Sequence, residues 1–125
     1  MASSEIREVP AAAALLHDAR FTDDSIQFSP EKREFRLVCW VPARTGRGRY
    51  GSAWTWKRVD LVVEGVSDCV IRKDQYISYY ELSTIRYSRD AGKLEIMTHY
   101  AVSIELIVDR VAIGLEEMAD TREQL

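Results

Sequence analysis

The sequence predicts an all-β domain, mainly antiparallel, which forms a small sandwich or open barrel with a short N-terminal helix. Apolar and polar residues alternate along several short segments, which is typical of strands with one buried face. Turn-forming residues separate these segments, and β-branched and aromatic residues are frequent within them. The chain has 125 residues, of which 46% are hydrophobic, and this is typical of one domain with one core. We therefore expect a single domain over residues 1–125, with loose ends at 1–9 and 118–125.

The first elements along the chain are a helix and strands joined by a turn. Pro10 and the run of alanines and leucines that ends at Leu16 predict a short helix, because proline is favoured in the first helical turn. Strand-like alternation starts within residues 20–28. A proline-containing turn is expected at 29–33. The next strand, over 35–41, has apolar residues on both faces, so both faces are expected to be at least partly covered.

The second half of the chain is expected to consist of strands joined by tight turns. Residues 89–93 are the strongest hairpin signal, because Gly92 can adopt the positive φ that such turns require. Apolar alternation runs to residue 108 and resumes in the opposite phase, which predicts a turn or bulge at 109–110. Residues 102–118 also fit a helical stripe, but their β-branched side chains favour a strand. Further strands are predicted over residues 59–63, 69–72 and 79–87.

The composition of the chain indicates in which compartment the protein is located and which classes of partner are disfavoured. The net charge of −3 disfavours a protein that coats DNA by neutralising phosphates. No apolar run approaches the ~20 residues needed to span a bilayer, so no membrane contact is predicted. Two cysteines, Cys39 and Cys69, predict a cytoplasmic protein with reduced, mostly buried thiols. No cofactor is predicted, and the oligomeric state stays open.

One segment is a candidate binding surface. No acidic residue occurs between Glu34 and Asp60, whereas six arginines and lysines do. Arginine beside aromatic rings suits a protein partner, and less well a nucleic acid or a small anionic molecule. The alternative is a solvated loop whose tryptophans belong to the core. The candidate binding residues are Arg44, Arg47, Arg49, Tyr50, Trp54, Trp56 and Arg58.

Motifs for catalysis and for metal or dinucleotide binding are weak. Residues 46–51 match the glycine pattern of dinucleotide-binding loops, but that use needs a helix directly afterwards, and residues 52–56 predict a strand or loop. Four zinc ligands exist only if the fold brings His17, His99, Cys39 and Cys69 together, which sequence leaves open. No nucleophile–base pair or metal-ligand spacing is visible, so an enzyme is the least supported class.

The order of features resembles that of small bacterial all-β domains, some of which are toxin-immunity proteins. The resemblance rests on Leu-Leu-His-Asp-Ala at 15–19, Ile-Gln-Phe at 26–28, the strand at 35–40 and Val-Glu-Gly-Val at 63–66. It implies a bacterial source and a non-enzymatic protein-interaction domain of the class that includes toxin-immunity proteins. It defines no catalytic residues. The alternative function is small-molecule or nucleic-acid binding through residues 44–58.

Overall fold

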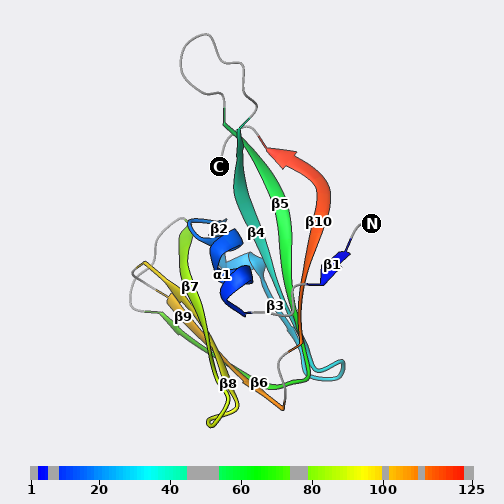
Figure 1. Ribbon diagram of the computed structural model, residues 1–125, viewed down its shortest axis with the longest axis vertical. Helices are drawn as coiled ribbons and strands as arrows, with labels where there is room; N and C mark the ends of the chain where they lie inside the picture. Colours follow the sequence, from blue (N-terminus) through cyan, green and yellow to red (C-terminus); the bar gives the residue numbers. More distant parts are fainter. Residues whose placement is uncertain are drawn as a thin grey trace.

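The chain folds into one antiparallel sheet with a short helix packed against it (Figure 1). The computed structural model describes residues 3–5, 9–44, 54–73, 79–99, 102–109 and 112–122. The mainly antiparallel β fold with a short N-terminal helix is therefore confirmed. The helices are α1 (Val9–Leu16) and the 3-10 turn η1 (Asp23–Ser25). The strands are β1 (Ser3–Glu5), β2 (Arg20–Phe21), β3 (Ile26–Ser29), β4 (Glu34–Arg44), β5 (Trp54–Glu64), β6 (Val66–Lys73), β7 (Tyr80–Ser88), β8 (Lys93–Thr98), β9 (Val102–Val108) and β10 (Ile113–Arg122).

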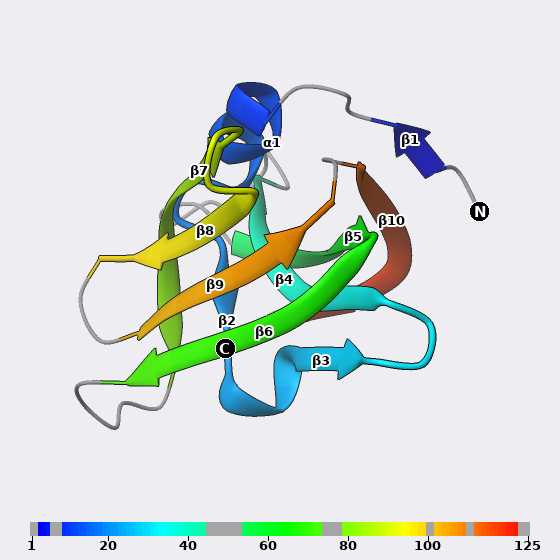
Figure 2. The ribbon, with the colours of Figure 1, turned by 90° about the horizontal axis from the view of Figure 1, so that it is seen from below.

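The sheet is open and bent into two halves. Its strand order is β1-β10-β5-β4-β2-β7-β8-β9-β6, with β3 attached to β4. The short strand β2 joins the halves, because Arg20 pairs with Trp40 of β4 on one side and with Glu81 of β7 on the other. The chain also passes between the halves at Gly65, where a φ of 74° lets β5 turn into β6. Figures 1 and 2 show α1 at one end of the space between the two halves.

The core lies between the halves, where alternate side chains from both point inward. The first half contributes odd-numbered residues of β4 and β5, including Phe35, Leu37 and Leu61. The second half contributes even-numbered residues of β8 and β9, and α1 adds Ala12 and Leu16. The fully buried members from β8 and β9 are Leu94, Ile96, Ile104 and Leu106.

Most predicted elements are confirmed. The helix ends at Leu16, and the turn after β3 is closed by a hydrogen bond of 3.3 Å from the Arg33 amide to the Pro30 carbonyl. Residues 102–118 contribute to two strands rather than a helix, with the break between Val108 and Ile113.

The ends of the chain differ from expectation. Ser3–Glu5 forms a strand, and β10 continues to Arg122, where loose segments were expected at 1–9 and 118–125. The reason is long-range: β5 extends to Trp54 and supplies β10 with backbone partners as far as the pair Arg122 and Trp56. Local polarity gives no signal for such a partner.

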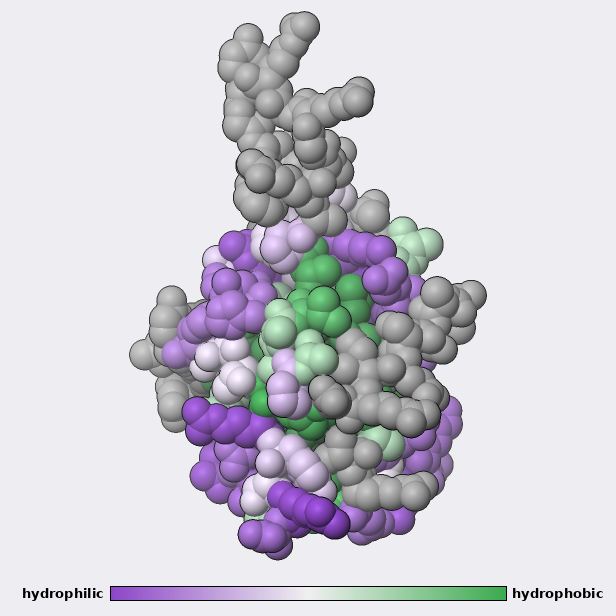
Figure 3. Space-filling model, viewed as in Figure 1, coloured by the Kyte–Doolittle hydropathy of each residue, from purple (hydrophilic) through white to green (hydrophobic). Residues whose placement is uncertain are grey.

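Apolar side chains are also present on the surface of the protein. In the space-filling view, an apolar area over β4 and β5 beside α1 is bordered by hydrophilic residues (Figure 3). Leu15, Val70 and Ile71 are the large apolar side chains most exposed among the described residues. No helix among the described residues is long and apolar enough to cross a membrane.

The geometry of the β7–β8 turn predicts how a substitution at Gly92 changes the stability of the fold. Gly92 has a φ of 60°, as expected, and a Cβ added to it would lie 3.1 Å from the Val108 carbonyl oxygen. Gly92→Val should therefore lower the free energy of unfolding by about 1–2 kcal/mol, measured by urea denaturation. Gly114→Val is the matched control, because a Cβ there meets nothing within 4 Å. Equal midpoints for the Gly92 variant and the wild type would refute this account of the turn.

Candidate functional site

The described residues of the predicted binding segment lie on β4 and β5. Arg44 and Trp54 face each other as the last backbone pair of the two strands. Arg47, Arg49 and Tyr50 lie outside the described residues. The glycine motif at 46–51 lies outside them as well, but strand β5 follows it at Trp54 in place of the helix that a dinucleotide loop requires.

Three basic residues of the interval between Glu34 and Asp60 have acidic partners in the folded chain. Arg58 holds Asp60 in a two-pronged contact, with Nε donating to Oδ1 at 2.8 Å and Nη2 donating to Oδ2 at 2.9 Å. Arg36 Nη1 donates to Asp60 Oδ2 at 2.7 Å and to Glu116 Oε2 at 2.9 Å. Lys57 pairs with Glu117 at 3.0 Å. Three of the six basic residues in the acid-free interval are thus neutralised by neighbours on β5 or β10.

Asp60 is the centre of this network. Its side chain is 0% exposed, although it points away from the main core. A buried carboxylate is stable only when it is paired and hydrogen-bonded, and the two arginines provide both. The hydrogen bond with Glu116, followed by that with Asp60, raises the pKa of the Arg36 guanidinium. Arg58, one of the candidate binding residues, therefore has a structural role.

The remaining candidate, Trp56, forms a cluster with Arg20 and Tyr79, which are not among the predicted binding residues. The guanidinium of Arg20 lies over the ring of Trp56 at 4.5 Å and over the ring of Tyr79 at 4.3 Å. We call these three residues the arginine clamp. Strand β2 places Arg20 there, because its neighbours Ala19 and Phe21 point into the core and leave Arg20 on the opposite face. Trp56 is only partly buried and lies outside the core cluster.

The clamp fixes the orientation of a cation. A guanidinium stacked on aromatic rings gains cation–π energy and keeps the N–H groups at its edge available to an acceptor. No acidic side chain of the described part of the chain pairs with Arg20. This contact cannot be predicted from the sequence, because Arg20 is remote from the 44–58 segment and β2 is too short to show a pattern.

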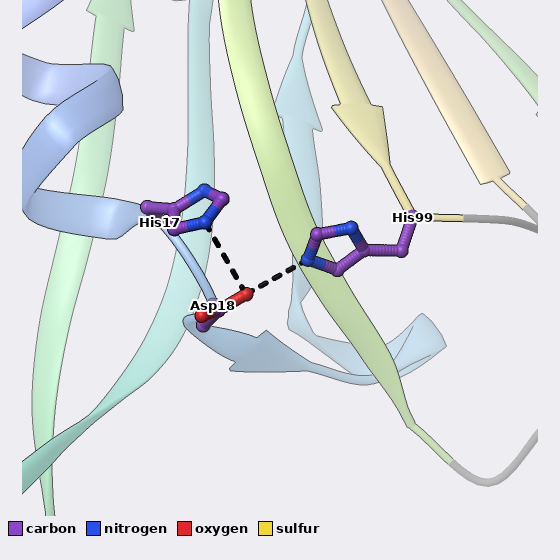
Figure 4. A group of neighbouring side chains, drawn as sticks. All are labelled: His17, Asp18 and His99. Atoms are coloured by element: carbon purple, nitrogen blue, oxygen red, sulfur yellow. Dashed lines mark hydrogen bonds and ion pairs between the residues drawn. The ribbon is translucent and has the colours of Figure 1, made fainter.

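A second cluster contains both histidines of the chain (Figure 4). His99 Nε2 lies 2.8 Å from Asp18 Oδ1, and His17 Nε2 lies 3.6 Å from the same oxygen. The two imidazole rings meet edge to face, with their centroids 5.7 Å apart. All three side chains are partly or largely exposed.

Successive carbonyls of β7 hold the cluster in place. The His99 amide donates to the Glu81 carbonyl at 3.1 Å, and the Asp18 amide donates to the Leu82 carbonyl at 2.8 Å. His17 Nδ1 donates to the Ser83 carbonyl at 2.9 Å. Ser83 is the extra residue of a bulge, since the register with β8 shifts between Leu82 and Thr84.

The cysteines do not join the histidines. Cys39 is buried in the core with a pKa raised by desolvation, and Cys69 is half-buried on β6 with a pKa raised for the same reason. Both are free thiols. The fold therefore brings the two histidines together with Asp18, and neither cysteine belongs to this group.

The chain matches no protein-family model, no curated protein and no solved structure, so inference about function depends on this geometry.

Proposed function

We propose that the protein is a non-enzymatic interaction domain that binds an acidic surface of a partner protein. The binding surface consists of the arginine clamp and the adjoining end of the β4–β5 hairpin. Inhibition of a toxin, as by the immunity proteins that the sequence resembles, is one function that such binding would serve. The observation that carries the proposal is the fixed cation of Arg20 between Trp56 and Tyr79.

The chemistry of the clamp favours a carboxylate. A guanidinium presents its N–H donors in a planar fork that fits both oxygens of a carboxylate. Because the rings already hold the Arg20 side chain, little conformational entropy is lost on binding. Partly buried Trp and Tyr rings beside an arginine are typical of interface hot spots.

A protein partner suits this surface better than a nucleic acid. Nucleic-acid binding depends on several cations that contact successive phosphates. Here Arg36, Lys57 and Arg58 are paired with acids, and the whole chain carries a net charge of −3. One oriented arginine supplies specificity for a carboxylate more readily than affinity for a polyanion.

A labelled peptide of glutamate residues is the probe for the first test. Fluorescence anisotropy should show that the protein binds it, with affinity that falls as salt is raised. Arg20→Lys keeps the charge but loses the planar fork, and should weaken binding about tenfold. Arg89→Ala is the control, because it removes an exposed positive charge from the turn at the opposite end of β7 (Figure 1).

Two further measurements test the contribution of the β4–β5 hairpin and the alternative that the protein binds a nucleic acid. Replacing Arg44, Arg47 and Arg49 with Ser should weaken peptide binding if the hairpin end contributes. A single-stranded oligonucleotide is titrated in parallel, and tighter binding of the oligonucleotide than of the peptide would favour the nucleic-acid alternative. An absence of peptide binding, or binding that is indifferent to both Arg20→Lys and salt, would exclude recognition of acids by the clamp.

A further inference from the structure

We propose that His17, Asp18 and His99 bind one divalent first-row transition metal ion, with Zn²⁺ as the reference case. The ligand atoms are the Nε2 atoms of the two histidines and a carboxylate oxygen of Asp18. This site is separate from the arginine clamp, and the inference does not depend on the proposed function.

The ligand atoms are already close to the spacing that a metal ion needs. They all lie within 4.8 Å of one another, and Asp18 Oδ1 lies 2.8 Å and 3.6 Å from the two Nε2 atoms. Ligands that bind one Zn²⁺ at ~2.0–2.2 Å are about 3–3.5 Å apart. Small side-chain rotations therefore suffice to place a metal ion between the three groups, which point toward one another in Figure 4.

Backbone contacts prepare the histidines for this role. His17 Nδ1 donates to the Ser83 carbonyl, so the neutral ring carries its lone pair on Nε2, the atom that faces Asp18. Metal-binding histidines are commonly oriented by such a hydrogen bond to a carbonyl. His99 Nε2 donates its proton to Asp18 Oδ1 when no metal is bound, and a metal ion would take the place of that proton.

The backbone around Asp18 is also unusual. Asp18 has a φ of 65°, a conformation that few side chains other than Asn and Asp adopt readily. The hydrogen bond from its amide to the Leu82 carbonyl fixes this turn directly after α1. The turn places two ligands from adjacent residues on the same side, beside the third ligand at the end of β8.

The chemical nature of the three ligand atoms determines which class of metal ion the site prefers. Two imidazoles and one carboxylate suit Zn²⁺, Ni²⁺, Cu²⁺ and Fe²⁺, whereas Mg²⁺ and Ca²⁺ prefer oxygen ligands. Three protein ligands leave at least one coordination position for water or for a donor from another molecule. Bound metal would also connect the end of α1 to the end of β8, so it should stabilise the folded chain.

Nuclear magnetic resonance offers a direct test, because the chain has only two histidines and both belong to the cluster. Zn²⁺ is titrated into tag-free protein while the imidazole proton signals are recorded. Both sets of signals should shift and reach saturation at one equivalent. An excess of Mg²⁺ should neither cause these shifts nor reverse them.

Matched variants then assign the ligands. In calorimetric titrations with Zn²⁺, His17→Gln, His99→Gln and Asp18→Asn should each weaken binding at least about tenfold, and should abolish the rise in Tm caused by Zn²⁺. Asn is chosen because it tolerates a positive φ. Asp90→Asn removes an exposed carboxylate from the distant β7–β8 turn, and Cys69→Ser removes the half-buried thiol, and both should bind Zn²⁺ as the wild type does.

Two results would overturn the inference. The first is that the chemical shifts of the wild-type imidazole signals do not change at one equivalent of Zn²⁺. This measurement uses the wild-type protein alone, so it does not depend on whether a variant folds. The second is unchanged Zn²⁺ affinity in both histidine variants. Neither result bears on the peptide binding of the arginine clamp, so the two proposals fail independently.

Discussion

Replacing Arg36 and Arg58 together with Ala is expected to lower the free energy of unfolding by about 3–5 kcal/mol. The double variant leaves the carboxylate of Asp60 fully buried and without the two cations that contact it. Urea denaturation followed by circular dichroism measures the loss. Either single variant should cost less, because the remaining arginine still contacts Asp60 Oδ2.

A rescue distinguishes the unpaired charge from lost packing. Adding Asp60→Leu to the double variant removes the uncompensated carboxylate, so much of the stability should return. Arg33→Ala is the control: it breaks the exposed pair with Asp109, and such pairs contribute about 0–1 kcal/mol. A double variant within 1 kcal/mol of the wild type would show that water reaches Asp60 readily.

Phe21→Ala is expected to have an effect of similar size, about 3–5 kcal/mol. The Phe21 side chain is 1% exposed and packs on the ring of Tyr80 with the centroids 5.5 Å apart. Tyr80 in turn donates a hydrogen bond of 3.0 Å to Asp23. Phe21 also lies in β2, the two-residue strand between the halves of the sheet, so the cavity would open where the halves join.

The unfolding experiment for Phe21→Ala has two readouts. The urea midpoint reports the loss of stability, and a lower m-value would indicate that the two halves no longer unfold together. Leu15→Ala is the control, because this leucine is 61% exposed and its truncation should change stability by less than about 0.5 kcal/mol. Equal effects of the two variants would contradict the role given to β2.

Sequence alone predicts the parts of this fold that depend on neighbours in the chain. The alternation in β4, β5 and β9 sets their inward faces, and Gly92 fixes a turn by its backbone preference. The strand order could not be predicted, because β2 has two residues and no periodicity can be read from so few. The extension of β10 likewise depends on β5, a distant partner.

The candidate binding residues likewise divide into those that the local sequence identifies and those that only the fold reveals. Trp56 is predicted as a binding residue because it lies in the segment between Glu34 and Asp60, where arginines occur beside aromatic residues and acids are absent. Its partner Arg20 could not be identified, because only the fold brings β2 beside it. Arg58 has the charge of a binding residue, but Asp60 lies two positions along the same strand and on the same face, and engages it. Charges counted along the chain do not show which of them form ion pairs once the strands lie side by side.

An open sheet leaves edge strands whose backbone groups can pair with a strand of another chain, and such pairing promotes aggregation. Strand β1, at one end of the strand order, is only three residues long. The edge at β6 carries the exposed charged side chains of Asp68, Arg72 and Lys73, and its pairing with β9 is interrupted between Val66 and Asp68. Short length, edge charges and an irregular ladder all disfavour the addition of a foreign strand. The short length of β1 and the charges and irregular pairing of β6 therefore reduce the tendency of these two strands to pair with another copy of the chain.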